Sequence, residues 1–231
     1  MLFKKNPVAA ATAPRHVRSF FEPTPDDLRL YRELSLRLRV QPPSSLFRYI
    51  PTPAGQHLTR LGDCGTWAWA AVIKAAMACW NDLPTGGKIA EDGTQLNSTP
   101  ERIAWEALRP VAPDDITLDV EPRIQIAGPA LFFSDLGIRF QDRVRYVEVV
   151  GACGADRVTR NDREAHLLAQ LDRRLAVYRQ KCLTPEIWYL NDLLEPAQLQ
   201  KRFLALVAQL RSGGGSRPRV RSGCRAGPSR A

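Results

Sequence analysis

Two carboxylate residues interrupt an apolar stretch in the middle of the chain. Asp135 stands near the start of the segment 134–140, Glu148 lies within the segment 144–151, and a polar turn at 141–143 separates them. Both segments are rich in β-branched and aromatic residues, which predicts the two strands of a hairpin. Because an unpaired buried carboxylate is costly, two that meet across a hairpin are expected to share a cation or a basic partner. The simplest functional interpretation is that Asp135 and Glu148 hold one divalent metal ion.

Several other elements are predicted around this hairpin. A capping sequence that ends in Glu101 predicts a helix over 99–109. Leucines at helical spacing predict a long helix over about 162–180. Further strands are expected at 116–120, 123–126 and 185–190. This order predicts an α/β fold in which helices flank a mixed central sheet.

The ordered set of elements resembles the PD-(D/E)XK nuclease superfamily, which has the restriction-endonuclease-like fold. Members carry an Asp at the start of one strand and a Glu-x-Lys on the next, often followed by Gly. Asp135, Glu148 and Gly151 occupy these positions, and the resemblance covers roughly residues 98–192. It implies DNA cleavage that depends on Mg²⁺ or Mn²⁺, with Asp135, Glu148 and the carbonyl of Val149 as metal ligands.

One position departs from the superfamily pattern, because Val150 replaces the motif lysine. A lysine there would position the attacking water and offset charge in the transition state. In some members the following helix supplies the basic group, and the residues available here are Arg163, Arg173, Arg174 and Lys181. Arg174 is preferred as the catalytic residue, because its mid-helix position could face the sheet edge. Val150→Lys is then expected to preserve or raise cleavage, and Arg174→Ala to reduce it.

Each of these acidic residues also has an ordinary structural explanation. Glu101 either completes a capping box or supplies a further catalytic carboxylate, as the resemblance implies. Glu106 is expected on the opposite, solvent-facing side of the same helix. Asp135 could start its strand as a cap-like residue, and Glu148 could pair with an arginine such as Arg139. Both explanations stay open at the level of sequence.

The charge of the chain favours a polyanionic partner, nucleic acid before a membrane surface. Its 231 residues include 33 Lys and Arg against 24 Asp and Glu, a formal net charge of +9. Part of the excess comes from two stretches without any acid, residues 1–21 and 196–231. We expect DNA as the partner, and we expect residues 1–25 and 212–231 to be disordered basic tails. These tails should strengthen binding to DNA without being needed for folding.

Composition and cysteine usage indicate a globular protein of a reducing compartment, with 44% hydrophobic and 25% charged residues. The five cysteines have no Cys-x-x-Cys spacing and no histidine at a zinc-ligand spacing, which argues against a disulfide framework and a zinc site. The apolar run 64–80 contains Lys74 and is too short to span a bilayer. The run 8–13 is too short for a signal peptide. A cytoplasmic protein without a membrane partner is therefore expected.

Residues 26–97 are predicted to form a mainly helical N-terminal region in front of a nuclease-like domain over 98–211. Its expected elements are a helix over 26–40, a short strand over 46–50 and a buried, tryptophan-rich helix over 62–80.

These observations predict a divalent-metal-dependent DNA endonuclease of a bacterial mobile element, defence system or repair pathway. An alternative is a catalytically inactive nuclease-fold subunit that binds DNA or a protein partner in a nucleoprotein complex. The missing lysine favours this alternative, and the retention of Asp135 and Glu148 argues against it. A third interpretation is an unrelated α/β interaction protein whose hairpin matches by chance. Metal binding with and without Asp135→Ala separates the three.

Overall fold

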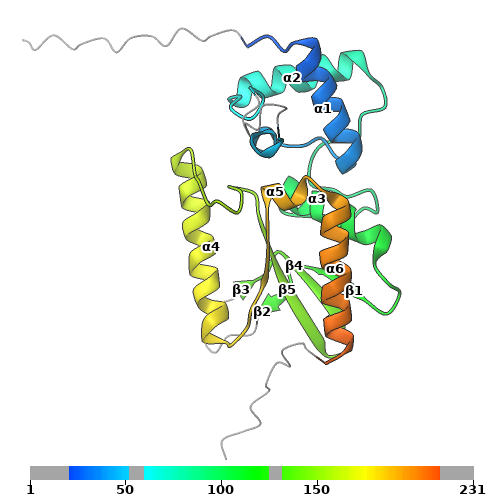
Figure 1. The fold of residues 1–231 in the computed structure, drawn as a ribbon, viewed down its shortest axis with the longest axis vertical. Helices are drawn as coiled ribbons and strands as arrows, with labels where there is room; N and C mark the ends of the chain where they lie inside the picture. The colour runs from blue at the N-terminus through cyan, green and yellow to red at the C-terminus, as the bar shows by residue number, and fades with distance from the viewer. Residues whose placement is uncertain (1–20, 52–59, 125–131, 214–231) are drawn as a thin grey trace, which may run out of the picture.

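The computed structural model describes residues 21–51, 60–124 and 132–213. They form a helical N-terminal part, blue to cyan in Figure 1, and a larger part in which helices cover both faces of a sheet. Residues 1–20 and 214–231, and with them most of the two expected tails, lie outside the described residues. So do residues 125 and 126, the end of the strand expected over 123–126.

The N-terminal part contains α1 (Pro25–Leu38), the 3-10 helix η1 (Ser44–Tyr49) and α2 (Thr66–Cys79). The Thr24 side chain caps α1 by accepting the N–H of Asp27, and the Asp27 carboxylate accepts the N–H of Thr24 in return. This reciprocal pair satisfies two backbone donors that a helix start otherwise leaves without a partner. The helix predicted from residue 26 is therefore present, and its start is fixed by the capping pair Thr24 and Asp27.

An aromatic cluster forms the centre of this part. The Phe47 ring of η1 lies 6.4 Å from the ring of Tyr31 and 5.3 Å from that of Trp69, measured between centroids. The strand expected over 46–50 is wrong. One turn of 3-10 helix directs both Leu46 and Phe47 into the core, whereas successive residues of a strand would point to opposite faces.

The helix expected over 62–80 is present as α2, but the expectation that it is buried is wrong. Only Val72 and Ala76 of α2 are buried, and the side chain of Trp67 is 82% exposed. Trp69 packs on the aromatic cluster, while Trp67 lies on the outer side of the helix. A helix that is apolar all round is typical of burial, but small alanines allow this one to lie at the surface at little cost.

The sheet has four strands in the order β1 (Thr117–Val120), β4 (Leu136–Phe140), β5 (Arg143–Val150) and β6 (Glu186–Tyr189). The first three are antiparallel, and β6 is parallel to β5. A parallel neighbour requires a crossover connection, and the helix between β5 and β6 provides it. A separate two-stranded ribbon is made by β2 (Arg123–Ile124) and β3 (Phe132–Phe133). The expectation of a mixed sheet flanked by helices is confirmed.

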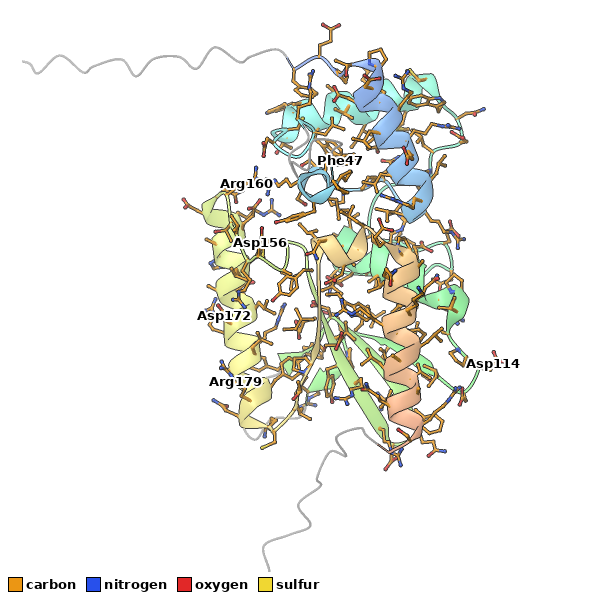
Figure 2. The ribbon with its side chains drawn as sticks, in the orientation of Figure 1. Phe47, Asp114, Asp156, Arg160, Asp172 and Arg179 are labelled. Carbon is orange, nitrogen blue, oxygen red and sulfur yellow. The ribbon has the colours of Figure 1, made fainter. Side chains whose placement is uncertain are left out.

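Helices cover the two faces of the sheet unequally (Figure 1). One face carries α3 (Thr99–Leu108), continued by the 3-10 helix η2 (Arg109–Val111), together with α5 (Leu190–Leu193) and α6 (Pro196–Arg211). The other face carries α4 (Asp162–Gln180). Figure 2 shows the side chains that fill the space between α4 and the sheet.

The alternation of side chains along β5 divides the interior into two cores. Val147 and Val149 belong to the main core with α3, α5 and α6, which continues into the N-terminal part. Val150 points the other way and joins a small second core with Leu171 of α4. Because successive strand residues face opposite sides, Glu148 faces α4 as well.

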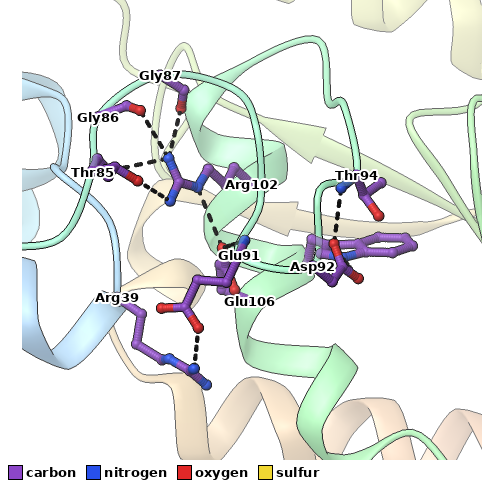
Figure 3. A network of polar contacts seen from close by, with 10 residues as sticks. Arg39, Thr85, Gly86, Gly87, Glu91, Asp92, Thr94, Arg102 and Glu106 are labelled. Atoms are coloured by element: carbon purple, nitrogen blue, oxygen red, sulfur yellow. Dashed lines mark hydrogen bonds and ion pairs between the residues drawn. The ribbon is translucent and has the colours of Figure 1, made fainter.

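Every residue of α3 after Thr99 is buried, including the charged ones. The Arg102 side chain donates hydrogen bonds to the backbone carbonyls of the loop at 85–87 and forms an ion pair with Glu106 (Figure 3). Glu106 also accepts the N–H of Glu91. The expectation that Glu106 faces solvent is therefore wrong, because the loop between α2 and α3 folds over that side of the helix and supplies its partners.

Several polar contacts join the N-terminal part to the segment around α4, among them an ion pair between Asp63 and Arg160. Arg48 Nη1 lies 2.7 Å from Glu164 Oε1 near the start of α4. The Tyr49 hydroxyl accepts the N–H of Gly154 at 2.7 Å. The N-terminal part therefore fixes the end of α4 that is nearest to it.

Candidate functional site

Asp135 and Glu148 lie opposite each other on neighbouring strands. The β4–β5 pairing matches Leu136 with Val147, and one step further it places Asp135 beside Glu148. Asp135 Oδ2 accepts the N–H of Val149 at 2.7 Å, which holds the carboxylate against β5. Both acidic side chains are on the face that α4 covers. The hairpin thus brings together the two carboxylates that sequence reasoning selected.

Arg174 of α4 reaches both carboxylates. Its Nε lies 2.8 Å from Glu148 Oε2, and its Nη2 lies 3.8 Å from Asp135 Oδ2. The first contact is an ion pair without hydrogen-bond geometry, since both atoms are buried and have no hydrogen-bond partner among the described residues. Glu148 does pair with an arginine, as its ordinary structural explanation expected, but the partner is Arg174, because Arg139 forms an ion pair with Asp119 of β1 at 2.7 Å.

Tyr178 also belongs to the site, and the sequence did not single it out. Its hydroxyl donates a 2.6 Å hydrogen bond to Glu148 Oε1. Its helical spacing with the leucines of α4 indicated only a core residue. The available signal was its position four residues after Arg174, because residues at that spacing lie on the same side of a helix. Each oxygen of Glu148 therefore faces a different residue of α4.

Glu101 brings a third carboxylate close to the other two. It is buried, and it accepts hydrogen bonds from the Ser98 hydroxyl and the N–H of Asn97. The expected cap is therefore present, although Glu101 contacts Asn97 instead of completing the reciprocal box. Burial raises the pKa of Glu101, and the negative charge of Asp135 raises it further. Glu101 thus acts as a capping residue, and its negative charge adds to the electrostatic potential at Asp135 and Glu148.

Gly151 allows the start of α3 to approach the end of β5. A Cβ atom at this position would lie 2.7 Å from Cγ of Pro100, closer than real Cβ contacts allow. The close packing of α3 on the end of β5 therefore requires a glycine at position 151. That packing carries Glu101 towards Asp135.

The remaining residues of the predicted site take different positions. The Val149 N–H is used by Asp135, and its side chain belongs to the main core. Val150 is buried in the second core, so a lysine there would enter an apolar space. Arg174 is the predicted basic residue that contacts the carboxylates. Within the described residues, Arg163 and Lys181 form no ion pair with them.

The electrostatics of the site follow from two acids that share one arginine, with the charge of Glu101 acting on both. Burial raises the pKa of Glu148 to about 7, and the charge of Asp135 adds to this, while Arg174 and Tyr178 oppose it. Burial likewise raises the pKa of Asp135, against the lowering effect of Arg174. Glu148 accordingly changes charge near neutral pH. Such a shift is typical of functional sites, where acids of like charge are held together.

This shift predicts a pH dependence of stability. The ordinary pKa of Glu148 is 4.5, so between pH 4.5 and 7 the unfolded chain loses a proton that the folded chain keeps. Stability should fall as the pH rises through this range, by at most about 3 kcal/mol. Glu148→Gln should remove this contribution. Urea unfolding of the natural protein and of Glu148→Gln at pH 5 and pH 8 measures this contribution. If the two proteins differ in free energy of unfolding by the same amount at both pH values, the prediction is contradicted.

In comparisons with known proteins, no family model, no curated protein and no solved structure matches the chain. In the part of the chain that the structure describes, no helix is both long enough and apolar enough to cross a membrane. Among the same residues, no group of three or more His, Cys, Asp or Glu side chains is arranged to hold a metal ion. The chemical groups of Asp135, Glu148 and Arg174 are therefore the features that bear on function.

Proposed function

We propose that the protein is a divalent-metal-dependent phosphodiesterase that cleaves DNA on a restriction-endonuclease-like fold. The observation that carries this proposal is the convergence of Asp135 and Glu148 on one cationic group of α4. Carboxylates can hold a divalent metal ion, and a cationic side chain beside them can offset the charge that builds on the phosphate during hydrolysis.

The order of the elements supports the proposed fold. α3 carries Glu101, Asp135 precedes β4, and Glu148 lies on β5. The long helix α4 follows, and β6 then pairs with β5. This is the order that the superfamily resemblance implies for residues 98–192. All three carboxylates lie where it places the acidic residues.

The chemistry of the donors fits a hard divalent cation. Mg²⁺ and Mn²⁺ prefer oxygen ligands, and carboxylates are their usual protein donors. Asp135 and Glu148 would hold the ion, and buried Glu148 Oε2, which has no hydrogen-bond partner in the described chain, fits this role. When bound, such an ion lowers the pKa of a water molecule and polarises the phosphate. The Val149 carbonyl remains a proposed further ligand.

The side chains of the protein would supply the rest of the chemistry. Arg174, always charged, can stabilise the negative charge that builds on the phosphate, although it is a poor proton acceptor. The Tyr178 hydroxyl fixes the orientation of Glu148 through its 2.6 Å hydrogen bond. Glu101 adds negative charge that favours a cation near Asp135.

A catalytically inactive DNA-binding subunit is the second candidate function. The observation in its favour is Val150, which packs with Leu171 at the position of the motif lysine. The ion pair of Arg174 with Glu148 also neutralises part of the charge that would attract a metal ion. A protein of this kind would bind DNA without cutting it.

Cleavage of supercoiled plasmid separates the two functions. The protein is incubated with plasmid in Mg²⁺, in Mn²⁺ and in chelator, and calorimetry with Mn²⁺ measures metal binding directly. Nicking or linearisation with metal alone is the expected result. DNA binding without cleavage in either metal would support the inactive subunit, and the absence of both would overturn both functions.

A further inference from the structure

We propose that one side of α4 holds the phosphate backbone of duplex DNA as it passes the carboxylates. This surface, the α4 stripe, consists of Arg163, His166, Gln170, Arg174 and Lys181. The inference rests on the proposed function and adds the surface on which the substrate lies.

Helical spacing places these residues in one row. They follow each other at intervals of three, four or seven residues, which is the repeat of a single helix side. The hydrogen bond between the side chains of His166 and Gln170, 2.9 Å long, shows two of them in contact. From Arg163 to Lys181 the row is about 27 Å long at 1.5 Å per residue.

Arg174 pairs with Glu148 and Asp135, and the other two cations of the stripe carry positive charge that the surrounding acids do not neutralise. Of the three acids of α4, Glu164 and Asp172 lie on other sides of the helix, whereas Asp162 lies four residues before His166, beside the start of the stripe. Glu164 pairs with Arg48, and Asp172 with Arg157. Among the described residues, neither Arg163 nor Lys181 forms an ion pair. The positive potential of the row therefore remains available to a polyanion.

Arg174 connects the stripe to the site. It contacts Glu148, which is fully buried, yet 31% of its own side chain is exposed. The Asp135 side chain is 15% exposed, so this carboxylate, which Arg174 also contacts, is the one of the pair that solvent can reach. A DNA strand bound along the α4 stripe would therefore pass beside Asp135.

A linear polyanion matches the shape of the stripe. Along one strand of B-DNA the charges repeat every 3.4 Å of helix axis, so a row of about 27 Å is as long as roughly eight phosphates. Contacts from arginine and lysine to phosphate fix the position of a duplex without reading its sequence. An acidic protein segment is the competing partner, and the experiment decides between them.

The test is the salt dependence of binding to a 30-base-pair duplex in chelator, where no cleavage can occur. The double variant Arg163→Ala/Lys181→Ala should lower the slope of log affinity against log salt by about two, since each lost phosphate contact removes about 0.9. Its affinity at 0.1 M salt should fall roughly tenfold or more. Thermal unfolding checks that the two substitutions, one at the exposed Arg163 and one at the partly buried Lys181, leave the fold intact.

The matched control is Arg179→Ala/Lys201→Ala, which removes the same charge. Arg179 lies seven residues after Asp172 on another side of α4, and Lys201 is an exposed residue of α6, which covers the other face of the sheet. The control should bind the duplex with nearly the slope of the natural protein. Equal slopes for both double variants would overturn the inference, as would duplex binding that survives while binding to polyglutamate is lost. Because these measurements need no cleavage, a plasmid that stays intact counts against the proposed activity alone.

Discussion

Asp135→Asn is expected to abolish metal-dependent cleavage of DNA, with a loss of about a thousandfold or more. The proposed metal ion contributes several kcal/mol to the transition state, and each 1.36 kcal/mol corresponds to a factor of ten in rate. Asparagine keeps an oxygen that can accept the N–H of Val149, so the contact between Asp135 and β5 should survive the substitution. Single-turnover cleavage measures the rate, and calorimetry should show a parallel loss of Mn²⁺ binding.

Asp119→Asn is the control for this experiment. Asp119 lies on β1, the strand beside β4, and its ion-pair partner is Arg139 instead of Arg174. It carries the same charge as Asp135 and is also partly exposed. The control should therefore cleave at close to the natural rate. An Asp135→Asn protein that cleaves normally would remove the basis of the proposed function.

Arg174→Ala should have two opposite effects. The rate of cleavage should fall about a hundredfold, because the group that offsets charge on the phosphate is lost. The affinity for Mn²⁺ should rise, since the cation that now lies 2.8 Å from Glu148 no longer competes for the carboxylate. A purely structural arginine would not produce this split. Single-turnover rates and Mn²⁺ titrations of the same variant measure both effects.

Two further variants test the role of this cation. Arg174→Lys keeps the charge and should recover part of the rate, whereas Arg173→Ala removes an exposed neighbouring charge and should change little. Val150→Lys in the Arg174→Ala background should restore some cleavage if the two positions supply the same function. Val150 is buried against Leu171, so this lysine also costs stability. Equal loss of activity in Arg174→Lys and Arg174→Ala would argue against a role for the charge.

Much of the fold follows from local patterns. The period of leucines in α4, the capped start of α3 and the alternation of residues in β4 and β5 are all signals over a few neighbouring residues. The pairing of Asp135 with Glu148 was predictable for the same reason, because a short turn fixes the register of a hairpin. These features depend on residues that are close in sequence.

The features that sequence reasoning missed depend on contacts between distant segments. Glu106 is buried because residues 85–91, which precede α3, fold over it. Tyr178 reaches Glu148 only after α4 crosses back over the sheet. Phe47 turns inward because Tyr31 and Trp69 surround it. No local pattern of side chains encodes such partners, since tertiary packing decides them.

The second core has a consequence for how this site can change during evolution. It contains four buried residues, Val150, Ala152, Cys153 and Leu171, and it is separate from the main core on the other face of the sheet. Substitutions in α4 therefore alter the cationic side of the site without repacking the larger interior. Under the proposed function, a charged residue can therefore be moved from the strand to the helix, or removed, without disturbing the main core, because the residues of the site and those of the main core lie on opposite faces of β5.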